Sequence, residues 1–325
     1  MKTLSNDVKA NNSIIAKPKK GLWYEIWRYK ILMLMLLPTI IYFIVFRYGP
    51  IVGIVIAFQD YTPSAGQGFI RSIINSPFVG IKQFHKFFTS MNGLQVVINT
   101  VLISVYKIIF GFPAPIVLAL LLNEVRQQHF KKVIQTISYL PHFISWVILA
   151  GILRIIFSPD TGVIVPIYKL LQIEPINFLG DPKYFRILLV VSDIWASVGW
   201  GSIIYLAALS NIDIQLYEAA TIDGANRFQQ LWHITLPSIS SVIVIMFILR
   251  VGNILDAGFD QVFNLLNPAV VSVGEIIDTY VYSRGLLNMD FSYSTAVGVF
   301  KSLIGFGMVL GVNYIAKKLG QEGIW

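Results

Sequence analysis

The sequence contains no cysteine and little charge. The absence of cysteine excludes disulfides, zinc–thiolate sites, iron–sulfur clusters and cysteine nucleophiles. Only 13% of the 325 residues are charged, about half the share that is usual in soluble domains, whereas 55% are hydrophobic. So few charged residues cannot cover a soluble surface of this size. The composition therefore indicates a polytopic membrane protein.

The sequence also lacks a phosphate-binding loop. No glycine is followed by lysine, which excludes a Walker A motif, and the HExxH, GxSxG and GxGxxG patterns are missing as well. The four histidines have no metal-ligand spacing, and no nucleophile or metal constellation is visible in the apolar segments. These absences weigh against an intramembrane enzyme, and they predict that this chain carries no cofactor of its own.

Six apolar segments approach the roughly 20 residues that a helix needs to cross the hydrocarbon core. We therefore expect an all-α polytopic membrane protein with about six transmembrane helices. A shorter apolar stretch, Ile51–Phe58, is interpreted as an interfacial or outward extension of the first span. The six predicted spans are residues 31–48, 95–123, 139–157, 187–211, 238–262 and 294–316.

The distribution of basic residues predicts the orientation of these spans. With the N-terminus inside, the inner segments hold thirteen lysines and arginines in 79 residues, against eight in the 107 residues of the outer segments. The positive-inside rule then places both termini in the cytoplasm. We expect a cytoplasmic tail over 1–30, a membrane domain over 31–318 and a cytoplasmic C-terminal tail over 319–325. The net charge of +8 follows from this bias and does not indicate nucleic-acid binding.

A polar hairpin, residues 212–237, separates the fourth and fifth spans and is expected to face the cytoplasm. Asp213 is a suitable N-cap for a first helix, and Gly224 is placed to end that helix in the left-handed conformation. Asn226 is suited to cap a second helix, with Gln229 three residues later completing a capping box. The hairpin is therefore predicted to consist of two short helices at an angle.

The surface of the first of these helices is suited to a partner. Ala219 and Ala220 keep it low, and Glu218 offers one carboxylate to an arginine on the partner. Pro237 is expected in the first turn of the fifth span, where proline is tolerated.

The spacing in the hairpin resembles the EAA loop of permease subunits of type I ABC importers. It consists of Glu218-Ala219-Ala220, then Gly224, then Ile234-x-Leu236-Pro237. Three further segments resemble the carbohydrate-uptake branch, the family of the maltose, multiple-sugar and alginate permeases. They are Leu140–Ser145, Phe259–Phe263 and Asn99-Thr100.

The resemblance implies a function and a set of partners. In that family the EAA loop forms a coupling helix that docks in a cleft of a separate ATPase dimer, where ATP and magnesium are bound. The other implied partners are a second permease subunit, an extracytoplasmic solute-binding protein, an oligosaccharide and the lipid of the bacterial cytoplasmic (inner) membrane. The ATPase-coupling residues would be Glu218, Ala219, Ala220, Asp223 and Gly224, and transport would proceed by alternating access.

Ionisable residues at membrane depth are costly, so they are candidates for function. In the predicted spans these are Lys107, Asp193, Arg250, Asp256 and Lys301, with Arg154 and Asp260 nearer the span ends. One interpretation is that Arg250 pairs with Asp193 or with another helix and only holds the helices together. The other is that cations such as Arg250 and Lys301 face a transport cavity and attract an acidic, uronate-containing sugar.

Aromatic and amide side chains complete the predicted substrate cavity, because sugars stack on rings and bond to amides. Its candidate residues are Trp195, Trp200, Arg250, Asn253 and Asp256. Two alternatives remain at this point. One is an ABC permease for an amino acid, phosphate or metal chelate, and the other is an ion-coupled secondary transporter with inverted repeats and paired intramembrane carboxylates.

Overall fold

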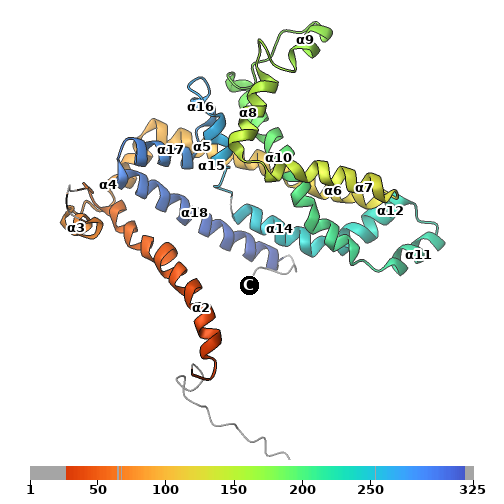
Figure 1. Ribbon diagram of the computed structural model, residues 1–325, viewed down its shortest axis with the longest axis horizontal. Coiled ribbons are helices and arrows are strands. Elements are labelled where there is room, and N and C mark those ends of the chain that lie inside the picture. The colour runs from red at the N-terminus through yellow and green to blue at the C-terminus, as the bar shows by residue number, and fades with distance from the viewer. Residues whose placement is uncertain (1–26, 64–65, 67, 253, 319–325) are drawn as a thin grey trace, which may run out of the picture. The chain divides into compact units, whose positions relative to one another are not determined.

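The computed structural model describes residues 27–63, 66, 68–252 and 254–318, and almost all of its secondary structure is helical (Figure 1). Within these residues, β pairing is limited to one bridge between Gln59 and Phe78. The predicted tails fall largely outside the described residues, at 1–26 and 319–325. The chain divides into two units, residues 1–53 and 54–325.

The first unit is built on an apolar helix, α2 (Lys30–Phe43), which continues through a π-helical turn, Ile44–Tyr48. None of the 14 residues of α2 is buried, although most of them are large and apolar. A 3₁₀ segment, Gly49–Phe58, then extends the helical run, which is 29 residues long from Lys30. The stretch 51–58 is therefore a helical extension of the first span, as expected.

Three long helical runs in the second unit agree with predicted spans. The first combines α5 (Met91–Tyr106), a π-helical turn (Lys107–Gly111) and α6 (Pro113–Glu124) into a run of 34 residues. The others are α10 (Pro182–Ser210) and α18 (Phe291–Lys318). Each run is apolar and long enough to cross a membrane, as is the run that starts at Lys30.

The third predicted span, 139–157, is not one straight helix. The chain forms α7 (Gln128–Tyr139) and a 3₁₀ turn (Leu140–Phe143), then bends by 108° before α8 (Trp146–Phe157). Ile144 and Ser145 at the bend have extended backbone. The helix α8 alone has 12 residues, so this region crosses a membrane only as a broken pair.

The fifth predicted span, 238–262, also needs correction. Helices α12 (Arg227–Gln230) and α13 (Leu236–Ser238) are joined by a π-helical turn and bend by 61° into α14 (Ser240–Gly252). Pro237 lies in the first turn of α13, where proline is tolerated as expected, and the break at Ile239 follows two residues later. A proline cannot donate to the helix ladder, and breaks commonly lie beside prolines and π-helical turns. Counting each bent pair once gives up to six spans.

Short helices fill the connections between the long runs. They are α3 (Phe69–Asn75), α4 (Lys82–Thr89), α9 (Val165–Leu171), α11 (Ile214–Ile222), α15 (Phe259–Leu265), α16 (Val271–Gly274) and α17 (Ile277–Tyr282). Helix α15 starts seven residues after α14 ends, so residues 259–262 belong to a separate helix and not to the fifth span.

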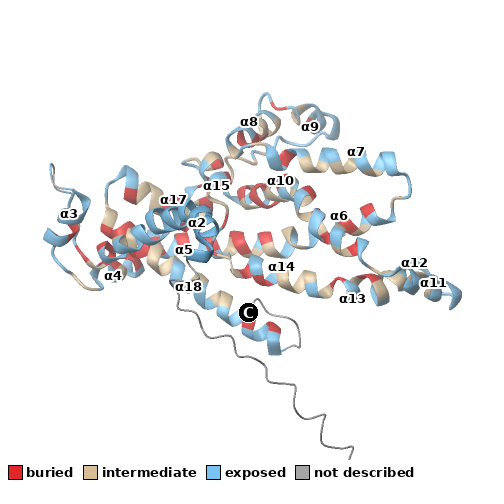
Figure 2. Ribbon diagram, turned by 60° about the horizontal axis from the view of Figure 1, so that its bottom comes forward, coloured by how far each residue is buried: buried red, intermediate tan, exposed pale blue. Residues whose placement is uncertain are grey.

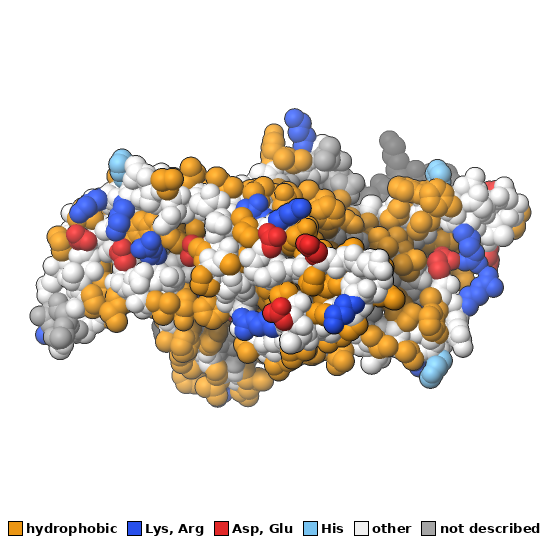
Figure 3. Space-filling view, turned by 90° about the horizontal axis from the view of Figure 1, so that it is seen from above, with side chains coloured by type: hydrophobic (Ala, Val, Ile, Leu, Met, Phe, Trp, Pro, Cys, Tyr) orange, Lys and Arg blue, Asp and Glu red, His pale blue; other side chains and the backbone are white. Residues whose placement is uncertain are grey.

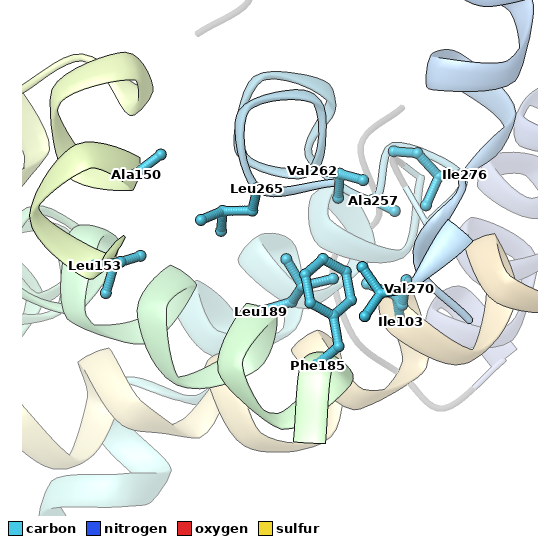
Figure 4. Close-up of a cluster of buried hydrophobic side chains, with 10 residues drawn as sticks. All are labelled: Ile103, Ala150, Leu153, Phe185, Leu189, Ala257, Val262, Leu265, Val270 and Ile276. Carbon is cyan, nitrogen blue, oxygen red and sulfur yellow. The ribbon is translucent and has the colours of Figure 1, made fainter. Parts of the chain in front are cut away.

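The main core of the second unit joins α5, α8, α10 and α15 (Figure 4). Phe185 and Leu189 of α10 are fully buried between Ile103 of α5 and Leu265 of α15. Further along α10, a Cβ on Gly199 would lie 2.1 Å from the backbone oxygen of Ser138. Only glycine permits this close approach between α10 and α7.

Outside the main core, the helices expose large apolar side chains. Buried positions are scattered along the helices among many exposed ones (Figure 2). A space-filling view shows hydrophobic side chains covering much of the visible face, with charged groups in separate clusters (Figure 3). This apolar surface is what a protein surrounded by lipid or by partner helices presents.

Candidate functional site

The polar hairpin between α10 and α14 carries the predicted coupling residues. Asp213 caps helix α11, and its carboxylate accepts the backbone N–H of Gln215 at 2.9 Å. Gly224 follows the end of the helix, with a φ of +81°, and donates its N–H to the carbonyl of Thr221 at 3.1 Å. The predicted N-cap and the predicted left-handed glycine are both confirmed.

The second helix of the hairpin, α12, is held by the predicted pair. The Asn226 side chain accepts the backbone N–H of Gln229 at 2.9 Å, and the Gln229 side chain accepts the backbone N–H of Asn226 at 2.7 Å. Gln230 then links the two helices by donating to the hydroxyl of Thr221 at 3.0 Å. The capping box is confirmed, and one direct side-chain bond joins the two helices.

Two further contacts hold the hairpin, one within it and one to a neighbouring helix. The hydroxyls of Tyr217 and Thr235 lie 2.9 Å apart, which joins α11 to the π-helical turn after α12. Arg227 bonds the carboxylate of Glu124 at the end of α6, the final helix of the second span. Because exposed ion pairs contribute little stability, this pair matters chiefly for the position of the hairpin. A cleft of about 740 Å³ lies between the hairpin and Asn123–Glu124.

Helix α11 presents its predicted coupling residues outward. None of its nine residues is buried, Glu218 and Ala219 are exposed, and Ile222 is 86% exposed. Among the described residues, no ion pair and no side-chain hydrogen bond engages the Glu218 carboxylate. Isolated helices this short are marginal in water. An exposed helix with apolar residues and a free carboxylate therefore has the form of a docking element.

A second cluster of polar residues lies within the spans. Lys107, in the π-helical turn of the second span, has a side chain that is only 4% exposed. Its Nζ lies 3.2 Å from Asp193 on α10 and 2.8 Å from the carbonyl oxygen of Ala257, and it also donates to Gln261 of α15. Gln261 donates in turn to the carbonyl of Leu189 at 2.7 Å. One buried lysine thus joins three elements.

Arg250 reaches the same carboxylate from α14. Its Nη2 lies 3.4 Å from the second oxygen of Asp193, and its side chain remains 46% exposed. The predicted pairing of Arg250 with Asp193 is therefore present. The exposed part of the guanidinium keeps donors free for another group, since it has five N–H bonds.

The remaining predicted cavity residues are distributed as follows. Trp200 stacks on His142 with ring centroids 4.8 Å apart and an interplanar angle of 2°, and about half of it is exposed. Trp195 is 39% exposed. Asp256 accepts the backbone N–H of Gly258 at 3.2 Å, and Asn253 lies outside the described residues.

A pocket of about 500 Å³ adjoins the Asp193 cluster. It lies where the bend before α8 meets α10 and α15, and it combines hydroxyl, amide, carboxylate and aromatic groups. Its polar and aromatic lining is formed by His142, Ser145, Trp146, Asp193, Ser197, Asp260 and Asn264. Of the predicted cavity residues, the four that the structure describes are not among those that line it, although Trp200 stacks on its His142.

Lys301 has a different environment from the one expected of a cavity cation. Its Nζ lies 2.6 and 2.7 Å from the two oxygens of Asp278 on α17. Both side chains are about a quarter exposed. Lys301 is therefore neutralised by a partner within the chain. Of the two cations predicted to face the cavity, Arg250 is the one that keeps exposed N–H donors.

Two residues of these sites were missed in the sequence. Gln261 was seen only as part of the segment Phe259–Phe263, and its uncharged side chain gave no signal of its role at Lys107. Glu124 ends the second span and gave no signal of its bond to Arg227, because the two are 103 residues apart. Among the described residues, no three acidic or histidine side chains form a group that could hold a metal ion.

Comparison with known proteins identifies the family of this chain. Residues 111–321 match the family described as binding-protein-dependent transport system inner membrane component. The chain belongs to this family. The match includes the hairpin together with Asp193 and Arg250, and it identifies the chain as a permease subunit of an ABC importer, whose ATPase is a separate subunit.

Individual relatives of this inner membrane component agree with the family. The polygalacturonan/rhamnogalacturonan transport system permease protein YteP of Bacillus subtilis (strain 168) is 46% identical over 327 residues, all of both chains. Protein LplB of the same organism is 46% identical over 298 residues, 92% of each chain.

A solved structure supports the fold. It is a crystal structure of a bacterial alginate ABC transporter in complex with an alginate pentasaccharide-bound periplasmic protein. The matched chain is 37% identical, with a TM-score of 0.86, and the match covers 94% of this chain and 100% of that one. The predicted fold class, the type I importer permease fold, is confirmed.

Proposed function

We propose that this inner membrane component forms half of a translocation pathway for an acidic oligosaccharide and is driven by ATPase subunits docked on α11. The observation that carries the proposal is the exposed coupling helix with the unpaired carboxylate of Glu218. ATP and magnesium would be bound by the ATPase dimer, because this chain has no Walker A loop. Glu218, Ala219, Ala220, Asp223 and Gly224 would form the docking surface.

The proposed orientation places the hairpin and both termini in the cytoplasm, where ATP is available. The excess of basic residues in the inner segments supports it. In this arrangement 31–318 is the membrane domain, and 1–30 and 319–325 are its cytoplasmic tails. A second permease subunit would complete the pathway, and an extracytoplasmic binding protein would deliver the sugar at the other side.

The nature of the cargo is inferred from two kinds of observation. YteP is described as a polygalacturonan/rhamnogalacturonan permease, and the solved transporter is described as one for alginate, an acidic polysaccharide. Within this chain, Arg250 offers exposed donors beside Asp193, and Trp200 stacks on His142 next to a polar pocket. A cation and aromatic faces suit a sugar that carries carboxylates.

The docking step is tested by reversing the charge of Glu218. In the intact complex, Glu218→Arg should lower the amount of co-purified ATPase at least about tenfold. The arginine would repel the ATPase cation that the carboxylate is proposed to attract. Glu174→Arg is the matched control, since Glu174 is an exposed glutamate in the connection between α9 and α10. If Glu218→Arg keeps both ATPase attachment and uptake, the coupling proposal is wrong.

The cargo is tested by ATPase stimulation of the complex with its binding protein present. We expect oligouronates to stimulate hydrolysis, and we expect Arg250→Gln to weaken this response more than the response to a neutral oligosaccharide of equal length. Equal loss with both sugars would remove Arg250 from charge recognition. Stimulation by an amino acid, phosphate or a metal chelate alone would replace the sugar with that cargo.

A further inference from the structure

An apolar groove lies between the second span and the first turns of α10, and none of the residues of the Asp193 cluster is among those that line it. It has a volume of about 640 Å³. Tyr106 and Phe110 line it from the second span, and α10 supplies the other side. The lining residues of α10 are Pro182, Lys183, Arg186, Ile187, Val190, Val191 and Ile194.

The groove has the length of one leaflet. The residues of α10 that line it run from Pro182 to Ile194, which is about 18 Å along a helix axis. Half of a hydrocarbon core is about 15 Å. Both cations lie in the first turns of α10, whereas the lining beyond Arg186 is entirely apolar. The groove is therefore polar at its mouth and apolar at membrane depth.

Arg186 is held at the mouth by neutral groups. Its Nε donates to the carbonyl of Val273 at 3.1 Å, and its Nη2 donates to the side-chain oxygen of Asn99 at 2.8 Å. A guanidinium has five N–H donors, so several remain for another acceptor. The ion pairs formed by the described residues include neither Arg186 nor Lys183. A fixed cation without a counter-ion is suited to an anion.

Lys183 adds a second positive charge one turn earlier. Its Nζ lies 5.1 Å from the centre of the Tyr184 ring, and its side chain is exposed. The carboxylate nearest in sequence is that of Asp181, which accepts the backbone N–H of Lys183 at 2.8 Å and so caps α10. The ammonium of Lys183 remains free to meet a phosphate at the membrane surface.

We propose that this groove binds one anionic phospholipid, with its phosphate between Lys183 and Arg186 and an acyl chain along Ile187–Ile194. Basic groups above an apolar groove between spans have the chemistry that recognises acidic lipid headgroups. An inorganic anion would use the cations but leave the apolar length empty. The orientation proposed above places this lipid in the outer leaflet, but the binding itself does not depend on that orientation.

The test uses the intact complex, reconstituted with phosphatidylglycerol or phosphatidylcholine and examined by native mass spectrometry for retained lipid. We expect phosphatidylglycerol to be retained preferentially. Lys183→Gln should weaken its binding about fivefold, which is the effect of one basic group near an anionic headgroup. Val191→Trp should displace the lipid by filling the groove without changing the charge. Lys169→Gln, on the exposed surface of α9, is the matched control and should have no effect.

Three outcomes would overturn the proposal. They are equal retention of the two lipids, unchanged binding in Lys183→Gln, and a cross-link from Val191→Cys to the second permease subunit, which would show that protein fills the groove. Any cross-link from this chain would come from position 191, because the chain has no other cysteine. ATPase attachment and uptake are measured in the same preparations, so a failure of the lipid site is distinguished from a failure of the coupling proposal.

Discussion

Removing the carboxylate of Asp193 should destabilise the membrane domain strongly. The change Asp193→Asn leaves the Lys107 ammonium, which is only 4% exposed, without its counter-ion at 3.2 Å. Breaking a buried pair from one side costs about 3–5 kcal/mol. Because the carbonyl of Ala257 and the side chain of Gln261 still accept from Lys107, we expect the lower end, about 3 kcal/mol.

The double variant Lys107→Met/Asp193→Asn separates charge from packing. It removes the uncompensated ammonium, but it leaves the acceptors of Ala257 and Gln261 without their donor, at about 1–3 kcal/mol each at most. The double variant should therefore lose less stability than the sum of the two single losses. We expect a coupling free energy of about 2 kcal/mol between the two positions in a double-mutant cycle. Arg250 adds little to it, because its side chain is about half exposed.

The assay is equilibrium unfolding of the purified complex, with Asp256→Asn as the matched carboxylate control. The Asp256 side chain accepts one backbone N–H, and the oxygen of asparagine is able to accept the same bond. If Asp193→Asn is as stable as Asp256→Asn, or if the double variant shows purely additive losses, the buried lysine is not held by this carboxylate in the way described.

Three further predictions follow from single positions. Gly199→Ala should destabilise the domain by about 1–3 kcal/mol in the same unfolding assay, because its Cβ would meet the backbone oxygen of Ser138 at 2.1 Å, and an unchanged protein would refute the contact. Gly224→Ala should cost about 1–2 kcal/mol through its φ of +81° alone, with no clash within 4 Å, and should therefore reduce ATPase co-purification without preventing assembly. Burial raises the pKa of Glu275, so the folded state loses stability as the pH rises above the usual value of 4.5; Glu275→Gln should be more stable than the parent at pH 7 but not at pH 4, and equal gains at both would contradict this.

The hairpin could be predicted from the sequence because its determinants are local. Asp213, Gly224 and the Asn226–Gln229 pair each act within four residues, so the chemistry of helix ends was sufficient to place both helices. The three long runs could also be predicted, since apolar length alone defines them.

The bends and the charge partners could not be predicted in the same way. The breaks at 144–145 and at Ile239 lie inside apolar segments, so hydrophobicity continues across them. Lys107 and Lys301 could be singled out because a charge at membrane depth is energetically unfavourable. Depth alone does not show which helices pack together, so it does not identify the partners of these lysines. The partner of Lys301, Asp278, lies outside every predicted span, so its role depends on tertiary packing.

The break at Ile239 gives the segment from Arg227 to Ser238 the geometry of a lever arm. Twelve residues of helix make an arm of about 18 Å, so a turn of about 10° at the break would sweep its far tip through about 3 Å. That sweep is as long as a hydrogen bond. Since Arg227 at the tip is bonded to Glu124, a rotation of this size would either move the end of the second span or break that bond. The displacement passed to the second span thus depends on the distance between Arg227 and the break at Ile239.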